Sequence, residues 1–131
     1  MVDLNRLKRD VLAECREDYV GLWSIIWRLR YALNGETYPL REDDRADPSE
    51  IRRLTLQLVQ ELLESGLVQA GLPTPDGKEF RPWPLTTREA ITRINSEWNT
   101  LGREPNIGDL VWFTTTEKGD KELEALRTDK A

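Results

Sequence analysis

The sequence predicts a mainly α-helical domain with a small β component. In this α+β fold, five helices are arranged around a central helix at residues 19–33, beside a short two- or three-stranded antiparallel sheet. Residues 19–33 are apolar or aromatic on nearly every side of a helix, as expected of a buried, central element. Apolar residues recur at helical spacing before and after it, and residues 110–115 are rich in β-branched and aromatic types, which predicts a strand. A length of 131 residues suits one domain, residues 1–131, with one core.

The first helix is predicted over residues 3–17, where apolar residues occur at helical spacing: Leu4, Leu7, Val11 and Cys15. The central helix follows and should end at Asn34–Gly35, a typical helix C-terminus. We expect its tryptophans, Trp23 and Trp27, to be buried in the core.

Two basic residues interrupt the central helix, Arg28 and Arg30. They mark positions where this helix should reach the surface or meet a carboxylate. With these charges, the helix is also too short and too polar to span a bilayer.

Residues 35–47 are polar and acidic, which predicts a loop with a short strand at Thr37–Leu40. A helix should follow over residues 48–65. Its start is marked by an N-cap, a proline in the first helical position and the acidic residue of a capping box: Asp47, Pro48 and Glu50. Gly66 should end it.

The second half begins with a short strand at residues 67–70. Residues 71–85 contain four prolines and predict a loose hairpin or an exposed loop. The helix at residues 87–101 carries its own capping box and stop signal: Thr86, Glu89 and Gly102. A last helix is predicted over residues 116–127, with residues 128–131 frayed.

The composition argues against catalysis. The chain contains no histidine and one cysteine, Cys15, so it lacks the commonest general base and the standard zinc ligands. No Walker-type or dinucleotide-binding glycine pattern occurs. We therefore predict a protein that is not an enzyme, with no catalytic residue, no cofactor and no metal site.

The net charge is −5, and both halves of the chain are acidic. Neither half is basic enough to hold a phosphate backbone, whose neutralisation usually dominates nucleic-acid affinity. The first residues are charged and lack the apolar run of a secretory signal. We expect a cytoplasmic protein with no membrane segment, and the sequence leaves its oligomeric state open.

Two stretches together resemble the winged-helix, or winged helix-turn-helix, superfamily. LVQELLESGLVQAG at residues 58–71 resembles the end of a recognition helix that runs into the first wing strand. LVWFTTTEKGDKELEAL at residues 110–126 resembles the last wing strand and the helix start that follows it. The resemblance implies a winged-helix-like domain whose wing is interrupted by the helix at residues 87–101.

The resemblance also implies a DNA-binding transcriptional regulator. The residues that would contact DNA lie on the recognition helix and the wing: Arg52, Arg53, Gln57, Gln60, Lys78 and Arg81. Two features disfavour this reading. The carboxylates at residues 42–47 would repel phosphates, and residues 36–47 do not predict the first helix of a helix-turn-helix.

Protein binding is the function that the sequence favours. Large aromatic residues and one arginine in the proline-rich segment and the last strand are typical of interface anchors: Phe80, Arg81, Trp83 and Trp112. An acidic surface suits a basic partner, for example a nuclease toxin neutralised by its immunity protein. We expect a small acidic interaction module of a regulatory or toxin-neutralising type, with DNA binding as the alternative.

Overall fold

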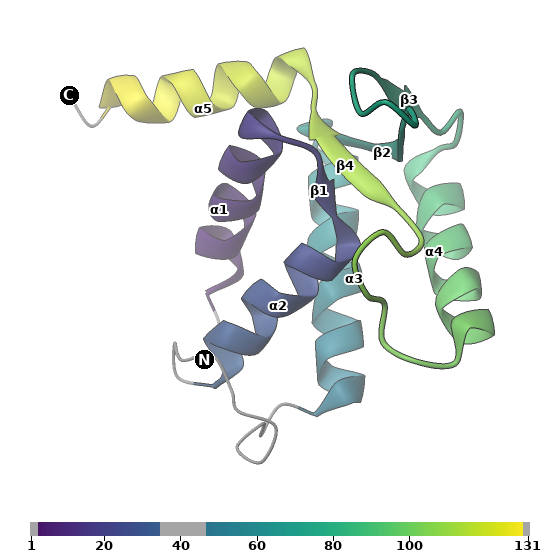
Figure 1. Ribbon diagram of the computed structural model, residues 1–131. Coiled ribbons are helices and arrows are strands. Elements are labelled where there is room, and N and C mark those ends of the chain that lie inside the picture. Colours follow the sequence, from purple (N-terminus) through teal and green to yellow (C-terminus); the bar gives the residue numbers. More distant parts are fainter. Residues whose placement is uncertain (1–2, 35–46, 130–131) are drawn as a thin grey trace.

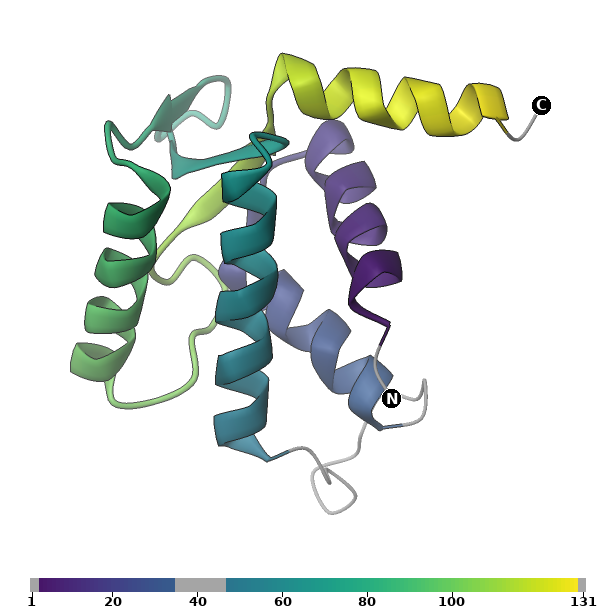
Figure 2. The same ribbon diagram turned by 180° about the vertical axis from the view of Figure 1, so that it is seen from behind.

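A computed structural model of the protein describes residues 3–34 and 47–129. These residues form an α+β fold with five helices and a four-stranded antiparallel sheet (Figure 1). The elements, in chain order, are α1 (Leu4–Glu17), β1 (Val20–Gly21), α2 (Leu22–Leu33), α3 (Pro48–Glu64), β2 (Val68–Pro73), β3 (Phe80–Pro82), α4 (Thr87–Leu101), β4 (Trp112–Thr115) and α5 (Glu117–Asp129). The strand order is β1-β4-β2-β3. In both views α3 lies between α1 and α4, and α5 crosses the end of α1 and extends beyond it (Figures 1 and 2).

One face of the sheet closes the core. The row of paired residues that faces inward is buried on all three strands: Val20, Phe113 and Ala70. The next row must face outward, because side chains alternate along a strand, and it consists of Gly21, Trp112, Gly71 and Pro82. At Gly71 the backbone of β3 comes so close that a Cβ atom would lie 2.8 Å from Pro82 Cα. β3 therefore crosses tightly over β2 on this outer face.

The core lies between α1, α2, α3 and the inner face of the sheet. α2 contributes the buried residues Leu22, Ile25, Ile26 and Leu29. α3 contributes a longer stripe, as its pattern predicts: Ile51, Leu54, Leu58, Val59 and Leu62. α4 reaches the same core with Ile94 and Trp98. The two helices α2 and α3 thus both contribute buried stripes to the core.

The end of α3 is bound to the start of α5. Gly66 has a φ of 74°, and the N–H of Leu67 donates to the C=O of Leu62 at 3.2 Å, which is the ending that the sequence predicts. Thr116 binds this turn twice, since its N–H donates to the C=O of Leu67 and its hydroxyl to the C=O of Gly66. At Gly119 a Cβ atom would press on the backbone of Leu67. The glycine therefore permits this close approach.

The predicted central helix is shorter than expected. α2 begins at Leu22, because Val20 and Gly21 pair with β4 as strand β1 and Gly21 is the N-cap. β1 and β3 also raise the sheet to four strands instead of two or three. The last strand begins at Trp112, and not at Leu110, because Leu110 has a φ of 68°, which lies outside the β region. The strand predicted at Thr37–Leu40 lies outside the described residues.

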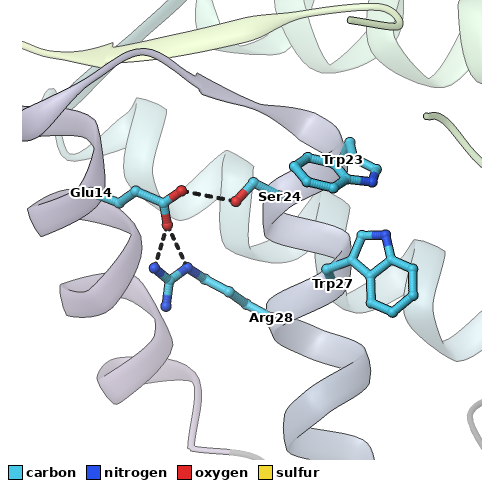
Figure 3. Close-up of a pocket in the computed structure, with 5 residues that line it drawn as sticks. All are labelled: Glu14, Trp23, Ser24, Trp27 and Arg28. Carbon is cyan, nitrogen blue, oxygen red and sulfur yellow. Dashed lines mark hydrogen bonds and ion pairs between the residues drawn. The ribbon is translucent and has the colours of Figure 1, made fainter. Parts of the chain in front are cut away.

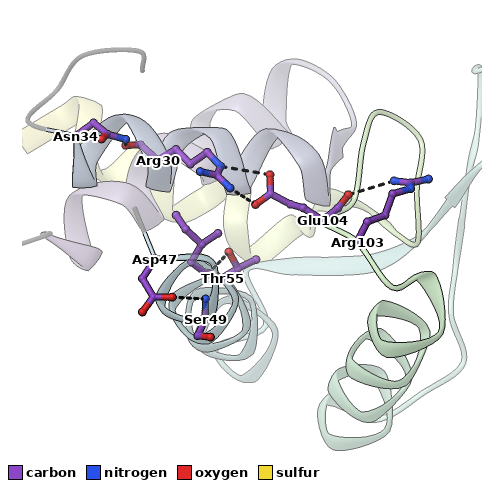
Figure 4. Close-up of polar contacts among 8 residues, drawn as sticks. Arg30, Asn34, Asp47, Ser49, Thr55, Arg103 and Glu104 are labelled. Atoms are coloured by element: carbon purple, nitrogen blue, oxygen red, sulfur yellow. Dashed lines mark hydrogen bonds and ion pairs between the residues drawn. The ribbon is translucent and has the colours of Figure 1, made fainter. Parts of the chain in front are cut away.

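The helix starts confirm most of the predicted capping. α4 spans the predicted residues, with the capping box of Thr86 and Glu89 complete. α3 is capped by Asp47, whose carboxylate accepts from the N–H of Ser49 at 2.9 Å (Figure 4). The predicted role of Glu50 in a second capping box is wrong, because Glu50 instead accepts from Arg53 at 2.7 Å.

Candidate functional site on the outer face of α2

The outward face of α2 carries two tryptophans one helical turn apart. Trp23 is half-buried and Trp27 is 37% exposed, so the prediction that both lie in the core is wrong. The reason is the spacing of the buried residues of α2. They occupy positions 22, 25, 26 and 29, which form one stripe and leave positions 23 and 27 on the opposite side. The sequence contains this spacing, but most of the intervening residues are apolar too, so the stripe does not stand out.

The two tryptophans border a hollow of about 500 Å³ between α1 and α2, lined by Glu14, Trp23, Ser24, Trp27 and Arg28 (Figure 3). Glu14 binds the two other polar residues of the hollow, Ser24 and Arg28. One carboxylate oxygen accepts from the Ser24 hydroxyl at 2.9 Å, and the other accepts from Arg28 Nε at 2.7 Å and from Arg28 Nη2. These bonds fix α1 against α2, and the two charges neutralise each other.

A second ion pair lies on the other side of the tryptophans. Arg30 Nη2 donates to Glu104 Oε1 at 2.5 Å, and Nε donates to Oε2 at 3.3 Å (Figure 4). A rotation of about 100° per residue places Arg30 beside the two tryptophans, on the side away from Ser24 and Arg28. Glu104 lies between α4 and β4, so this pair ties that connection to α2. The prediction that Arg28 and Arg30 each meet a carboxylate or the surface is confirmed.

The hollow offers both hydrogen-bond donors and acceptors, since the Ser24 hydroxyl donates to Glu14 and its oxygen can still accept. The indole nitrogens of Trp23 and Trp27 lie on the side of α2 away from Glu14 and the Arg28 guanidinium (Figure 3). Both oxygens of Glu14 accept hydrogen bonds. The site can therefore hold a ligand that offers apolar surface to the two rings and polar groups beside them. It is poorly suited to a cation, because its one carboxylate is neutralised by Arg28.

Comparison of the chain with protein-family models, curated proteins and solved structures gave no match. Among the helices of residues 3–34 and 47–129, none is long and apolar enough to cross a membrane. The functional conclusion therefore rests on the geometry of the chain itself.

Two of the aromatic residues predicted to bind a partner are used within the fold. Phe80 stacks on Tyr19, with 5.2 Å between the ring centroids. Trp112 covers Gly21, where a Cβ atom would lie 3.6 Å from its ring. Both rings are half-buried, so this outer face of the sheet still offers some aromatic surface.

The other two predicted partner-binding residues lie at the edge of the sheet and beside α4. Trp83 is half-buried, and the Arg93 guanidinium lies 4.0 Å from its ring centroid. Arg81 is exposed on β3. The four predicted residues therefore lie on or next to the sheet, in or after β3 and in β4. The tryptophans of α2 form a separate site.

The residues predicted to contact DNA are partly engaged by α4. Arg52 donates to Asn95 Oδ1 at 2.5 Å and to Asn99 Oδ1 at 2.7 Å, and its guanidinium lies 5.1 Å from the Trp98 ring centroid. These contacts pack α4 against α3. All of these hydrogen bonds are donated by Arg52 Nη2, and Nε and Nη1 take no part in them.

The remaining predicted DNA contacts are exposed. Arg53 pairs with Glu50, and Gln60 donates to Glu64 at 2.9 Å. Three others are exposed on α3 and the β2–β3 hairpin: Gln57, Lys78 and Arg81. The cations of this face are therefore interleaved with carboxylates.

Three carboxylates in the described part of the chain have pKa values below their usual range. The clear shifts are all downward: the Thr74 hydroxyl lowers the pKa of Asp76, the N–H of Thr86 lowers that of Glu89, and the N–H of Asn106 lowers that of Asp109. A general acid at neutral pH needs a raised pKa. In the described residues, three or more metal-ligating side chains do not come together either.

We expect the thiol of Cys15 to be inert in the native protein. Burial, followed by the charge of Glu14, raises its pKa to about 12. A thiol reagent at about pH 8 should therefore modify the protein only in denaturant, measured as released chromophore. The thiol stays protonated in the fold, so its contribution to stability is complete below about pH 9 and declines as the pH rises toward 12. Rapid modification of the native protein would contradict this burial.

Proposed function

We propose that the protein is a non-catalytic interaction module that binds another protein through the outer face of α2. The exposure of Trp27 beside the half-buried Trp23, at the mouth of a preformed hollow, carries this proposal. Tryptophan and arginine are the residues most enriched at the energetic centres of interfaces. The ion pairs of Arg28 and Arg30 hold the surroundings of the two rings in place, which reduces the entropy lost on binding.

The charge of the chain favours a basic partner. A net charge of −5 attracts a basic protein over a distance and repels nucleic acid. Such a module fits a regulatory or a toxin-neutralising role.

We further propose that the fold is a winged-helix variant. The order α1-β1-α2-α3-β2, closed by β4 between β1 and β2, supports this proposal, with β3 and α4 inserted between the two long strands. On this assignment α2, and not residues 36–47, precedes the recognition helix α3. The packing of α4 against α3 through Arg52 favours protein binding over the DNA-binding alternative.

Capture of a partner from a lysate of the native host tests the proposed function. We expect the wild-type protein to retain at least one protein that the double variant Trp23→Ala/Trp27→Ala loses by about tenfold or more, measured by quantitative mass spectrometry. Leu72→Ala is the matched control, because Leu72 is also a large exposed apolar residue, on β2.

The proposal would be contradicted if the wild-type protein, the double variant Trp23→Ala/Trp27→Ala and Leu72→Ala all captured the same proteins. Retention of DNA that falls steeply with salt, and that Arg53→Ala weakens, would favour the DNA-binding alternative.

A further inference from the structure

The connection between α4 and β4, residues 102–111, contains a strained backbone conformation. Among the described residues other than glycine, Leu110 alone has a positive φ, of 68°. The N–H of Val111 donates to the C=O of Asp109 at 2.9 Å, so Leu110 is the centre of a γ-turn. With a positive φ, this is the rare and strained form of the turn, because a Cβ atom crowds the backbone there. Such a conformation persists only where the surrounding contacts hold it.

Contacts on both sides of Leu110 hold the turn. Before it, the Asp109 carboxylate accepts from the N–H of Asn106 at 2.8 Å and from Arg103 Nη1 at 2.9 Å. After it, Val111 is 0% exposed, and its C=O accepts from the N–H of Leu22 at 3.1 Å. The turn is therefore fixed between the carboxylate of Asp109 and the buried Val111.

The same connection holds α2 at both ends. α2 has Gly21 as its N-cap and no side-chain cap, and the first N–H groups of a helix have no acceptor within the helix. The C=O of Val111 supplies an acceptor to the first of them, that of Leu22. At the other end, Glu104 binds Arg30 in the last turn of α2 (Figure 4). These two contacts lie about 12 Å apart along the helix.

We propose that residues 102–111 form a strained brace that positions α2 and opens as one unit while the core stays folded. Opening removes the backbone acceptor from Leu22 and the carboxylate from Arg30 together. Leu110 then adopts an extended backbone, which the β-rich run that it begins favours. The strain at Leu110 lowers the free energy of this opening relative to that of the core.

The brace also affects the face of α2 that carries the tryptophans. Trp23 is the second residue of α2, so its ring keeps its place beside Trp27 only while the start of the helix is held. This consequence for partner binding rests on the proposed function, whereas the brace itself does not.

Native-state hydrogen exchange of backbone amides, followed by NMR, tests whether the brace opens as one unit. In the wild type, the amides of Leu22 and Val111 should exchange at least about tenfold faster than that of Leu58, which is 0% exposed in α3. Glu104→Gln should accelerate the exchange of both amides by about fivefold, although Glu104 binds the opposite end of α2. Glu97→Gln is the matched control. It removes an arginine–carboxylate pair within α4 and should leave both amides unchanged.

Two substitutions of Leu110 test the strain. Leu110→Gly and Leu110→Ala both remove the leucine side chain beyond Cβ, but glycine adopts a positive φ without strain. The amides of Leu22 and Val111 should therefore exchange about fivefold more slowly in Leu110→Gly than in Leu110→Ala. In urea, Leu110→Gly should also unfold at the higher concentration. The order should be reversed for Leu72→Gly and Leu72→Ala, because Leu72 lies in β2 and has no positive φ.

Three results would overturn the inference: exchange of Leu22 and Val111 only together with Leu58, unchanged exchange of Leu22 in Glu104→Gln, or faster exchange in Leu110→Gly than in Leu110→Ala. In each case the proposed function would still stand if a captured protein depends on the two tryptophans. If the amides behave as expected but no captured protein depends on those tryptophans, the brace stands and the proposed function fails.

Discussion

Gly71→Ala should lower the free energy of unfolding by about 2–3 kcal/mol. Gly71 lies in β2 directly opposite Pro82 of β3, and the added methyl carbon would lie 2.8 Å from Pro82 Cα and 2.9 Å from the carbonyl carbon of Arg81. Both neighbours are backbone atoms, so no side-chain rotation can relieve the contact. β3 must move away from β2. The measurement is equilibrium unfolding in urea, followed by tryptophan fluorescence.

Gly21→Ala is the matched control for this variant. Gly21 lies in the same outward row of the sheet, but its added methyl carbon would meet the Trp112 ring at 3.6 Å, an ordinary contact. Its cost should stay below about 1 kcal/mol, mainly from the exchange of glycine for alanine at the N-cap of α2. Equal losses at the two positions would contradict the close crossing of β3 over β2.

The elements with local signals were predicted well from the sequence. α4 has the predicted bounds because Thr86, Glu89 and Gly102 determine its ends through contacts within a few residues. The end of α3 at Gly66 follows for the same reason. Such signals depend on backbone conformation and short-range hydrogen bonds, which a sequence states directly.

The elements that depend on distant contacts were not predictable in the same way. β1 consists of Val20 and Gly21 and exists only because β4 pairs with it, so nothing in the local sequence distinguishes it from a helix start. The carboxylate that Arg30 meets is also distant, since Glu104 follows in the chain only after α4. Pairing across the fold therefore decided where α2 begins and what surrounds it.

The number of apolar residues in α2 predicts a helix buried on every side, whereas their spacing predicts one buried stripe and one exposed face. Leu22, Ile25 and Leu29 already suffice for a buried stripe, and Trp27 is left outside it. Of the aromatic residues predicted to bind a partner, Phe80 contacts Tyr19 within the fold. A surplus of large apolar residues on one helix is a signal of a second, exposed face.

Leu29→Ala should have the other large effect on stability. Leu29 is 0% exposed, and its truncation leaves a cavity between α2 and the rest of the core, at a cost of about 3 kcal/mol. The loss measured for this variant is the reference for a buried residue of α2, because Leu29 lies two residues from Trp27 on the buried side of the same helix.

The free energy of unfolding of Trp27→Ala, measured beside that of Leu29→Ala, tests most directly whether α2 has a face that the fold does not need. Trp27 is 37% exposed and has no hydrogen bond in the described part of the chain. We predict a loss of about 1 kcal/mol for Trp27→Ala against about 3 kcal/mol for Leu29→Ala. A loss at Trp27 of about 3–5 kcal/mol, equal to or above that at Leu29, would place this tryptophan in the core and contradict the proposed site.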